Sequence, residues 1–108
     1  MNIGQIAKMA QQMQTQMAQA QDELKETTLE ATAGGGAVRI VITGAQEVRS
    51  VEIDPSAVDA DEVEMLQDLV LSAMNEAITR SKELERERMG RIAGGMGIPG
   101  MPGLPGMG

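Results

Sequence analysis

Apolar and polar residues alternate between Thr28 and Asp54, and this period of two predicts β-strands. Glycines 34–36 and Gly44 divide the stretch into three runs, which indicates a three-stranded antiparallel meander. In the third run Val48 is out of phase with the later apolar positions, so we expect a bulge near Arg49 and Ser50. Three strands with one apolar face are barely stable alone, so the sheet needs a cover.

The N-terminal segment has apolar residues at alternating steps of three and four, which predicts a long helix from Asn2 to about Lys25. This apolar stripe consists of Ile3, Ile6, Ala10, Met13, Met17, Ala20 and Leu24. Seven glutamines and a single lysine, Lys8, occupy much of the remaining surface before Asp22. The stripe is as narrow as a coiled-coil seam, so we expect a partner helix to pack on it. Its methionines are interpreted as packing residues, with an adaptable partner-binding surface as the alternative.

A second long helix is expected after the sheet, because Asp59 stands three residues before Glu62 as in a capping box. Strands of about seven residues span roughly 24 Å, which some 16 helical residues cover. We therefore expect residues 62–77 to lie on the sheet and residues 78–89 to overhang it and pair with the first helix. The wide apolar face expected on the sheet consists of Met65, Leu66, Leu69, Val70, Ala73, Met74, Ala77 and Ile78.

These elements predict an α+β fold in which a single domain covers residues 1–93. Residues 94–108 are rich in glycine, proline and methionine, and they are interpreted as a flexible tail. The narrow stripe and the small sheet both leave apolar surface that one copy cannot cover, so we expect a homodimer.

The 108-residue chain contains no histidine, cysteine or aromatic residue. The commonest general base and the strongest nucleophile are therefore missing, and the serines have no partner for a catalytic triad. The acidic residues between Asp54 and Glu64 lack the ligand spacing of a calcium loop. We expect a protein that is not an enzyme and has no cofactor, metal or small-molecule substrate. Its apolar runs fall far short of the roughly 18 residues of a membrane span, so no membrane association is expected.

Positive charge is concentrated near the C-terminus, although the net charge is −7. Residues 55–79 hold six acidic and no basic side chains, whereas residues 80–108 hold five basic and three acidic ones. Interleaved glutamates make a solvated helix with ion pairs such as Glu83 with Arg86 one interpretation of this segment. A phosphate-binding surface is the other.

Five short motifs decide between these interpretations by their order and spacing. They are Met9–Met13, the turn Ala33–Gly36, Val51–Pro55, Glu64–Leu69, and Met89-Gly90 followed by a Gly/Met/Pro tail. Together they resemble the YbaB/EbfC family of bacterial nucleoid-associated proteins. The resemblance implies a cytoplasmic homodimer with protruding helices that binds double-stranded DNA in the nucleoid and compacts or regulates it.

With this resemblance, the basic side chains become candidates for contacts to the DNA phosphate backbone. The candidate residues are Lys8, Lys25, Arg80, Lys82, Arg86, Arg88 and Arg91. The alternative is a protein-interaction module that uses its methionine-rich stripe or its tail, with any DNA association indirect.

Deleting residues 94–108 should leave the melting temperature within a few degrees, because nothing in this segment extends a helix or the sheet. Thermal unfolding of the full-length and shortened chains tests this expectation. A large drop would mean that apolar tail residues such as Ile98 or Leu104 pack on the body.

Overall fold

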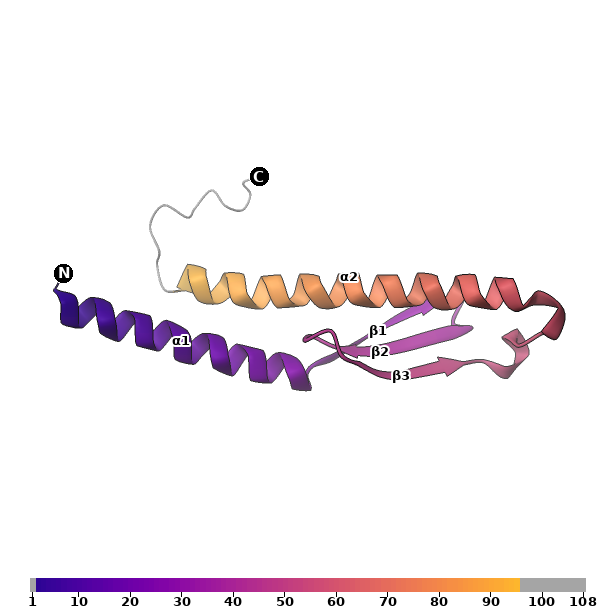
Figure 1. The fold of residues 1–108 in the computed structure, drawn as a ribbon, viewed down its shortest axis with the longest axis horizontal. Helices are drawn as coiled ribbons and strands as arrows, with labels where there is room; N and C mark the ends of the chain where they lie inside the picture. Colours follow the sequence, from indigo (N-terminus) through magenta and orange to yellow (C-terminus); the bar gives the residue numbers. More distant parts are fainter. Residues whose placement is uncertain (1, 96–108) are drawn as a thin grey trace, which may run out of the picture.

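The computed structural model describes residues 2–95, which form an elongated molecule of 70 × 28 × 16 Å (Figure 1). Helix α1 (Ile3–Glu26) leads into strands β1 (Thr28–Ala33), β2 (Val38–Thr43) and β3 (Val48–Ile53). Two 3-10 turns, Pro55–Ala57 and Ala60–Glu62, connect the sheet to helix α2 (Val63–Gly95). The α+β class and the order of the elements are confirmed.

Helix α1 begins and ends close to the predicted residues, because both ends have local caps. The Asn2 Oδ1 atom accepts a hydrogen bond from the Gln5 amide at 2.7 Å. At the other end, the amide and hydroxyl of Thr27 donate to the Glu23 carbonyl at 2.9 and 2.8 Å. Thr27 itself has extended backbone and passes the chain directly into β1.

The sheet has the predicted meander order β1-β2-β3, and both pairings are antiparallel. Glycines 34–36 all have positive φ, which lets them form the tight connection between β1 and β2. The predicted bulge is also confirmed. Val41 pairs with Ser50 and Ile42 pairs with Val48, so Arg49 is the extra residue.

Helix α2 covers only part of the apolar sheet face. It lies over β1 and β2, where the buried core consists of Ala31, Val38, Ile40, Ile42, Ala73 and Ala77. Residues paired across antiparallel strands share a face, so Val51, opposite Ile40, belongs to the same apolar surface. Val51 is nevertheless 45% exposed. The cover that the sheet requires is therefore incomplete over β3.

The start of α2 differs slightly from the prediction, and its end differs more. Asp59 caps the chain as expected, accepting from the Asp61 amide at 2.9 Å, but it opens a 3-10 turn and α2 begins at Val63. The helix then continues past Met89 to Gly95. Gly94 and Gly95 therefore belong to α2, and the remainder of the predicted tail lies outside the described residues.

The sheet-covering part of α2 is longer than residues 62–77, which corrects the predicted start of the overhang. Ser81 is fully buried, and its hydroxyl donates to the Thr43 carbonyl at 2.6 Å. A Cβ placed on Gly44 would lie 3.2 Å from a Leu84 methyl group, so α2 still faces the β2–β3 turn there. The estimate counted strands alone, whereas this turn adds length that α2 also covers. The overhanging arm begins near Glu85.

Replacing Ser81 with alanine should lower the free energy of unfolding by about 0.5–1.5 kcal/mol, because it removes one of the two hydrogen bonds to the buried Thr43 carbonyl, and the Gln46 amide retains the other. Ser72→Ala is the matched control, since Ser72 is an exposed residue of the same helix. Urea unfolding of both variants measures the difference. Equal stability of the two would show that the Ser81 hydroxyl contributes nothing to the fold.

Candidate nucleic-acid interface

Helix α1 and the end of α2 run side by side and antiparallel, and they form one arm at the end of the sheet (Figure 1). Ala20 and Leu24 are buried at the base of this arm. Farther out, α1 extends past the end of α2, and the exposure of its stripe rises to 53% at Ile6 and 83% at Ile3. The expected helix partner is therefore α2 of the same chain, but only for the inner part of the stripe.

One side of the arm carries basic residues of both helices, with Arg88 and Arg91 in a groove and Lys8 farther out on α1. The groove between the helices is lined by Gln16, Gln19, Ala20 and Glu23 of α1 and by Arg88, Arg91 and Ile92 of α2. The same side of α1 continues outward through a shallow surface formed by Lys8, Gln11, Gln12, Thr15 and Gln16. Gln16 belongs to both surfaces, so Lys8, Arg88 and Arg91 share one continuous side, which we call the glutamine side.

Three other candidate cations lie away from the glutamine side. Lys25 lines a separate small cavity with Glu85 and Ala45, and it forms an ion pair with Asp22 at 3.8 Å. Lys82 and Arg86 are exposed and lie about one turn apart on a stripe that is rotated by roughly 120–180° from Arg88 and Arg91. The seven candidates therefore do not form a single cluster.

Arg80 is not part of the arm. Its guanidinium donates to the backbone carbonyl of Glu30 in β1, so it lies over the sheet. The expectation that Arg80 lies in the overhang was wrong, because α2 covers the sheet for longer than the strand lengths indicated.

The charges on the arm are only partly paired among residues 2–95. Arg91 forms an ion pair with Glu87 at 3.0 Å, one turn earlier on α2. The pair expected between Glu83 and Arg86 is not among the ion pairs of this part of the chain. Exposed pairs of this kind contribute about 0–1 kcal/mol, so an incoming phosphate can replace the carboxylate at little cost.

A second charged cluster lies on the sheet. Arg39 bridges Glu30 of β1 and Glu52 of β3, with 2.7 Å to the Glu52 carboxylate. The hydrogen bond from Arg39 lowers the pKa of the Glu30 carboxyl below its ordinary value. This cluster ties the three strands together and has no contact with the arm.

Sequence reasoning missed one functional candidate, Arg49. Its guanidinium donates to the backbone carbonyl of Lys25, in the last turn of α1, at 2.9 Å. The available signal was the phase break at Val48, which indicated the bulge but not the direction of the Arg49 side chain.

The described residues hold no group of three or more acidic, histidine or cysteine side chains arranged as a metal site. Over the same range, neither helix is long and apolar enough to cross a membrane.

This architecture defines a class of protein with a small α+β body and a projecting helical arm. Comparison with known proteins identifies the family. Residues 1–96 match the model of the YbaB/EbfC DNA-binding family, and the chain belongs to this family.

Relatives in several bacteria are named nucleoid-associated proteins. One from Acetivibrio thermocellus is 50% identical over 96 residues, covering 89% of this chain and 85% of its own. Another from Chloroflexus aurantiacus is also 50% identical over 96 residues, covering 89% of this chain and 96% of its own.

The fold is also present in a solved structure. The crystal structure of an uncharacterized protein from Helicobacter pylori superposes with a TM-score of 0.76 at 22% identity, covering 86% of this chain and 98% of that one. At this identity the likeness supports the fold alone.

Proposed function

We propose that this protein binds double-stranded DNA as a homodimer, with the glutamine side of each arm against the phosphate backbone. The observation that carries the proposal is the position of Lys8 of α1 and of Arg88 and Arg91 of α2 on two adjoining surfaces that share Gln16. Membership of a DNA-binding family supports the same ligand.

The composition of α1 suits an arm that lies along DNA. From Ile3 to Gln21 it contains no acidic residue, and Lys8 is its only charge. Glutamine amides donate hydrogen bonds to phosphate oxygens without adding net charge. Such contacts fix the position of the protein on the duplex but carry little sequence information.

The other candidates have smaller roles in this proposal. Arg86 on the second side of the arm, and Lys82 one turn before it at the base, attract DNA at longer range. Lys25 is paired with Asp22, and Arg80 is bound to the sheet, so these two contribute least.

A second copy of the chain is proposed to cover the apolar groove between α2 and β3. The groove has a volume of about 410 Å³, and it is lined by Ile53, Val63, Leu66, Gln67, Val70, Leu71 and Met74. Leu71 is 59% exposed at its edge. A contiguous apolar surface on so small a body is typical of a protein interface, and two-fold pairing buries the same groove on both copies.

In the cell, this activity corresponds to a cytoplasmic protein of the nucleoid that compacts DNA or affects gene expression. The names of the relatives support the association with the nucleoid. A dimer carries two arms, so it contacts a duplex at two places or joins two segments of DNA.

A second candidate function is recruitment of a protein partner by the outer part of α1. The exposure of Ile3, Ile6, Met9 and Met17 favours it, because methionine-rich surfaces adapt to varied partners. In that case the association with DNA is indirect.

The salt dependence of duplex binding tests the glutamine side. If about four phosphates are neutralised per dimer, log affinity falls against log salt with a slope near −3.6, or roughly 150-fold between 50 and 200 mM salt. The variant Lys8→Gln, Arg88→Gln, Arg91→Gln should flatten this slope by half or more and weaken binding to all duplexes alike.

The matched control changes the same number of charges on the other side: Lys25→Gln, Lys82→Gln, Arg86→Gln. It should keep most of the affinity and most of the slope. If the control lost more affinity than the test variant, the glutamine side would not be the DNA surface. If the wild-type protein bound duplex with no salt dependence, backbone binding itself would be refuted.

Leu71→Asp should convert the dimer to a monomer, because it places a charge in the apolar groove. Ser72→Asp adds the same charge at the neighbouring exposed position and should leave the dimer intact. Sedimentation velocity at tens of micromolar distinguishes the two. A wild-type monomer at that concentration, or a Leu71→Asp dimer as stable as the control, would contradict the proposed interface.

A further inference from the structure

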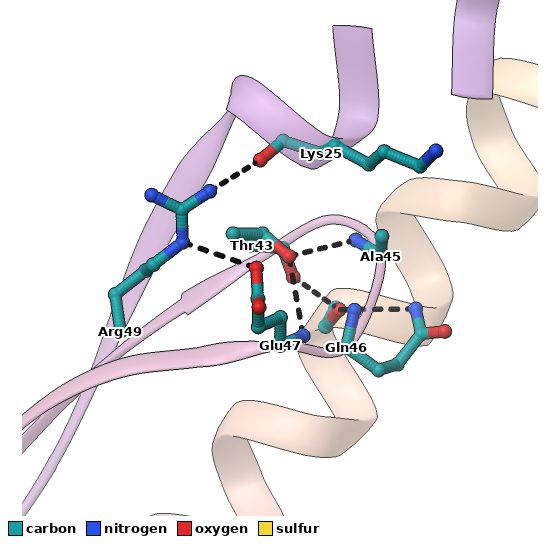
Figure 2. A network of polar contacts seen from close by, with 7 residues as sticks. Lys25, Thr43, Ala45, Gln46, Glu47 and Arg49 are labelled. Atoms are coloured by element: carbon teal, nitrogen blue, oxygen red, sulfur yellow. Dashed lines mark hydrogen bonds and ion pairs between the residues drawn. The ribbon is translucent and has the colours of Figure 1, made fainter. Parts of the chain in front are cut away.

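The C-terminal end of α1 is fastened to the body by its backbone carbonyls. The Gly44 amide donates to the carbonyls of Leu24 and Thr27 at 3.0 and 2.9 Å. The Arg49 Nη2 atom donates to the carbonyl of Lys25 at 2.9 Å. Gly44 belongs to the β2–β3 connection and Arg49 to the first residues of β3, so the two ends of this turn determine how α1 leaves the sheet. Figure 2 shows the contact between Arg49 and Lys25.

The bulge explains why Arg49 reaches α1. Arg49 is the extra residue between the Val41–Ser50 and Ile42–Val48 pairs, and a bulge redirects the side chain at that point. The Glu47 carboxylate holds the same guanidinium at 3.3 Å on its Nε atom (Figure 2). The Arg49 guanidinium is thereby aimed at the helix end and is already engaged on two sides.

The same connection is fixed to α2 through Ser81. The Ser81 hydroxyl donates to the Thr43 carbonyl and accepts from the Gln46 amide and side-chain nitrogen at 3.2 and 3.1 Å. The Thr43 hydroxyl accepts from the amides of Ala45 and Glu47 at 3.1 Å each. One rigid turn therefore contacts both helices of the arm.

A small rotation of α1 where it contacts the β2–β3 turn causes a large displacement of the N-terminal tip of the helix. Helix α1 has 24 residues, which corresponds to a length of about 36 Å. A rotation of about 10° at its base displaces the tip by roughly 6 Å, half the width of the major groove. Lys8 lies toward the tip, whereas Arg88 and Arg91 are on α2, so their alignment depends on this angle.

We propose that Arg49 is a positioning residue for DNA binding: from its bulge it clamps the end of α1 and sets the angle between the two helices of the arm. This inference rests on the proposed function, because the angle matters for DNA only if the glutamine side binds it. The clamp itself is a property of the free protein. It is therefore measurable without DNA.

The test compares Arg49→Gln with Arg39→Gln. Each variant loses one positive charge and its ion pairs with glutamate, but only Arg49 contacts α1. Because the chain has no cysteine, spin labels can be introduced at two exposed positions, Gln5→Cys and Glu83→Cys. Mixing labelled protein with an excess of unlabelled protein isolates the distance within one copy.

In Arg49→Gln the label distance should broaden or shift by several ångströms, whereas Arg39→Gln should retain the wild-type distribution. If only about a tenth of the arms remain in the binding orientation, the apparent Kd for a duplex rises about tenfold. Arg39→Gln should change the Kd less than threefold. Melting temperatures of both variants should agree within a few degrees, which separates positioning from general unfolding.

An unchanged label distance in Arg49→Gln would overturn the proposal, even if duplex affinity fell, because Arg49 would then contact DNA directly. A changed distance with unchanged affinity would overturn its link to DNA binding. If wild-type protein did not bind duplex at all, the proposed function would fail, and the label distance would still decide whether Arg49 sets the arm.

Discussion

The packing of the β2–β3 turn between the C-terminal end of α1 and the interior of α2 around Ser81 is the constraint on which the rest of the structure depends. Gly44 has no side chain at the closest approach, and a Cβ there would lie 2.6 Å from a Leu24 methyl group. Leu24 is fully buried at this point, whereas most of α1 beyond it is exposed. Because α1 has so little other support, its C-terminal carbonyls and the Leu24 side chain must hold it. Helix α1 is therefore held mainly at its C-terminal end. The orientation of the basic residues on the arm depends on the contacts at that end.

Because the sheet is small, the stability of the fold is also expected to depend on association of two copies. One helix covers two strands, and within residues 2–95 the apolar face of β3 is left partly uncovered. Burying one Leu or Val side chain stabilises by about 1.5–3 kcal/mol, while a domain is stable by only about 5–15 kcal/mol in total. A second copy on the groove at Leu71 would thus supply a large fraction of the stability. In such a protein, dimerisation and folding are expected to be coupled.

Sequence periodicity predicted the parts of this fold that depend on the pattern of neighbouring residues along the chain. The strands followed from alternation, the end of α1 from its stripe, and the bulge from the single phase break at Val48. Residues whose positions depend on tertiary contacts were not predictable in this way. Arg80 was assigned to the arm because the length of the turn beneath α2 was not counted. The sequence does not show which basic residues share a side of the arm. That depends on the rotation of α2 relative to α1, which is determined where Ser81, Leu24 and Ala20 are buried. The role of Arg49 depends on the direction in which the bulge turns its side chain.

The elongated shape also explains how an acidic protein can bind DNA. Most of the excess negative charge lies in residues 55–79, at the far end of α2 and in the segment that leads into it. Twenty-six residues separate Glu62 from Arg88, a helical distance of about 39 Å. Screening at physiological salt has a length of about 8 Å, so the carboxylates near Glu62 exert little force on a phosphate at Arg88. A compact body with the same net charge would repel DNA from every side. Residues 3–26 and 85–95, which form the arm, hold five basic and five acidic side chains, so the arm has no net charge of its own. It lies several screening lengths away from the acidic end, so a duplex bound at the arm would meet its basic residues rather than the net negative charge of the chain.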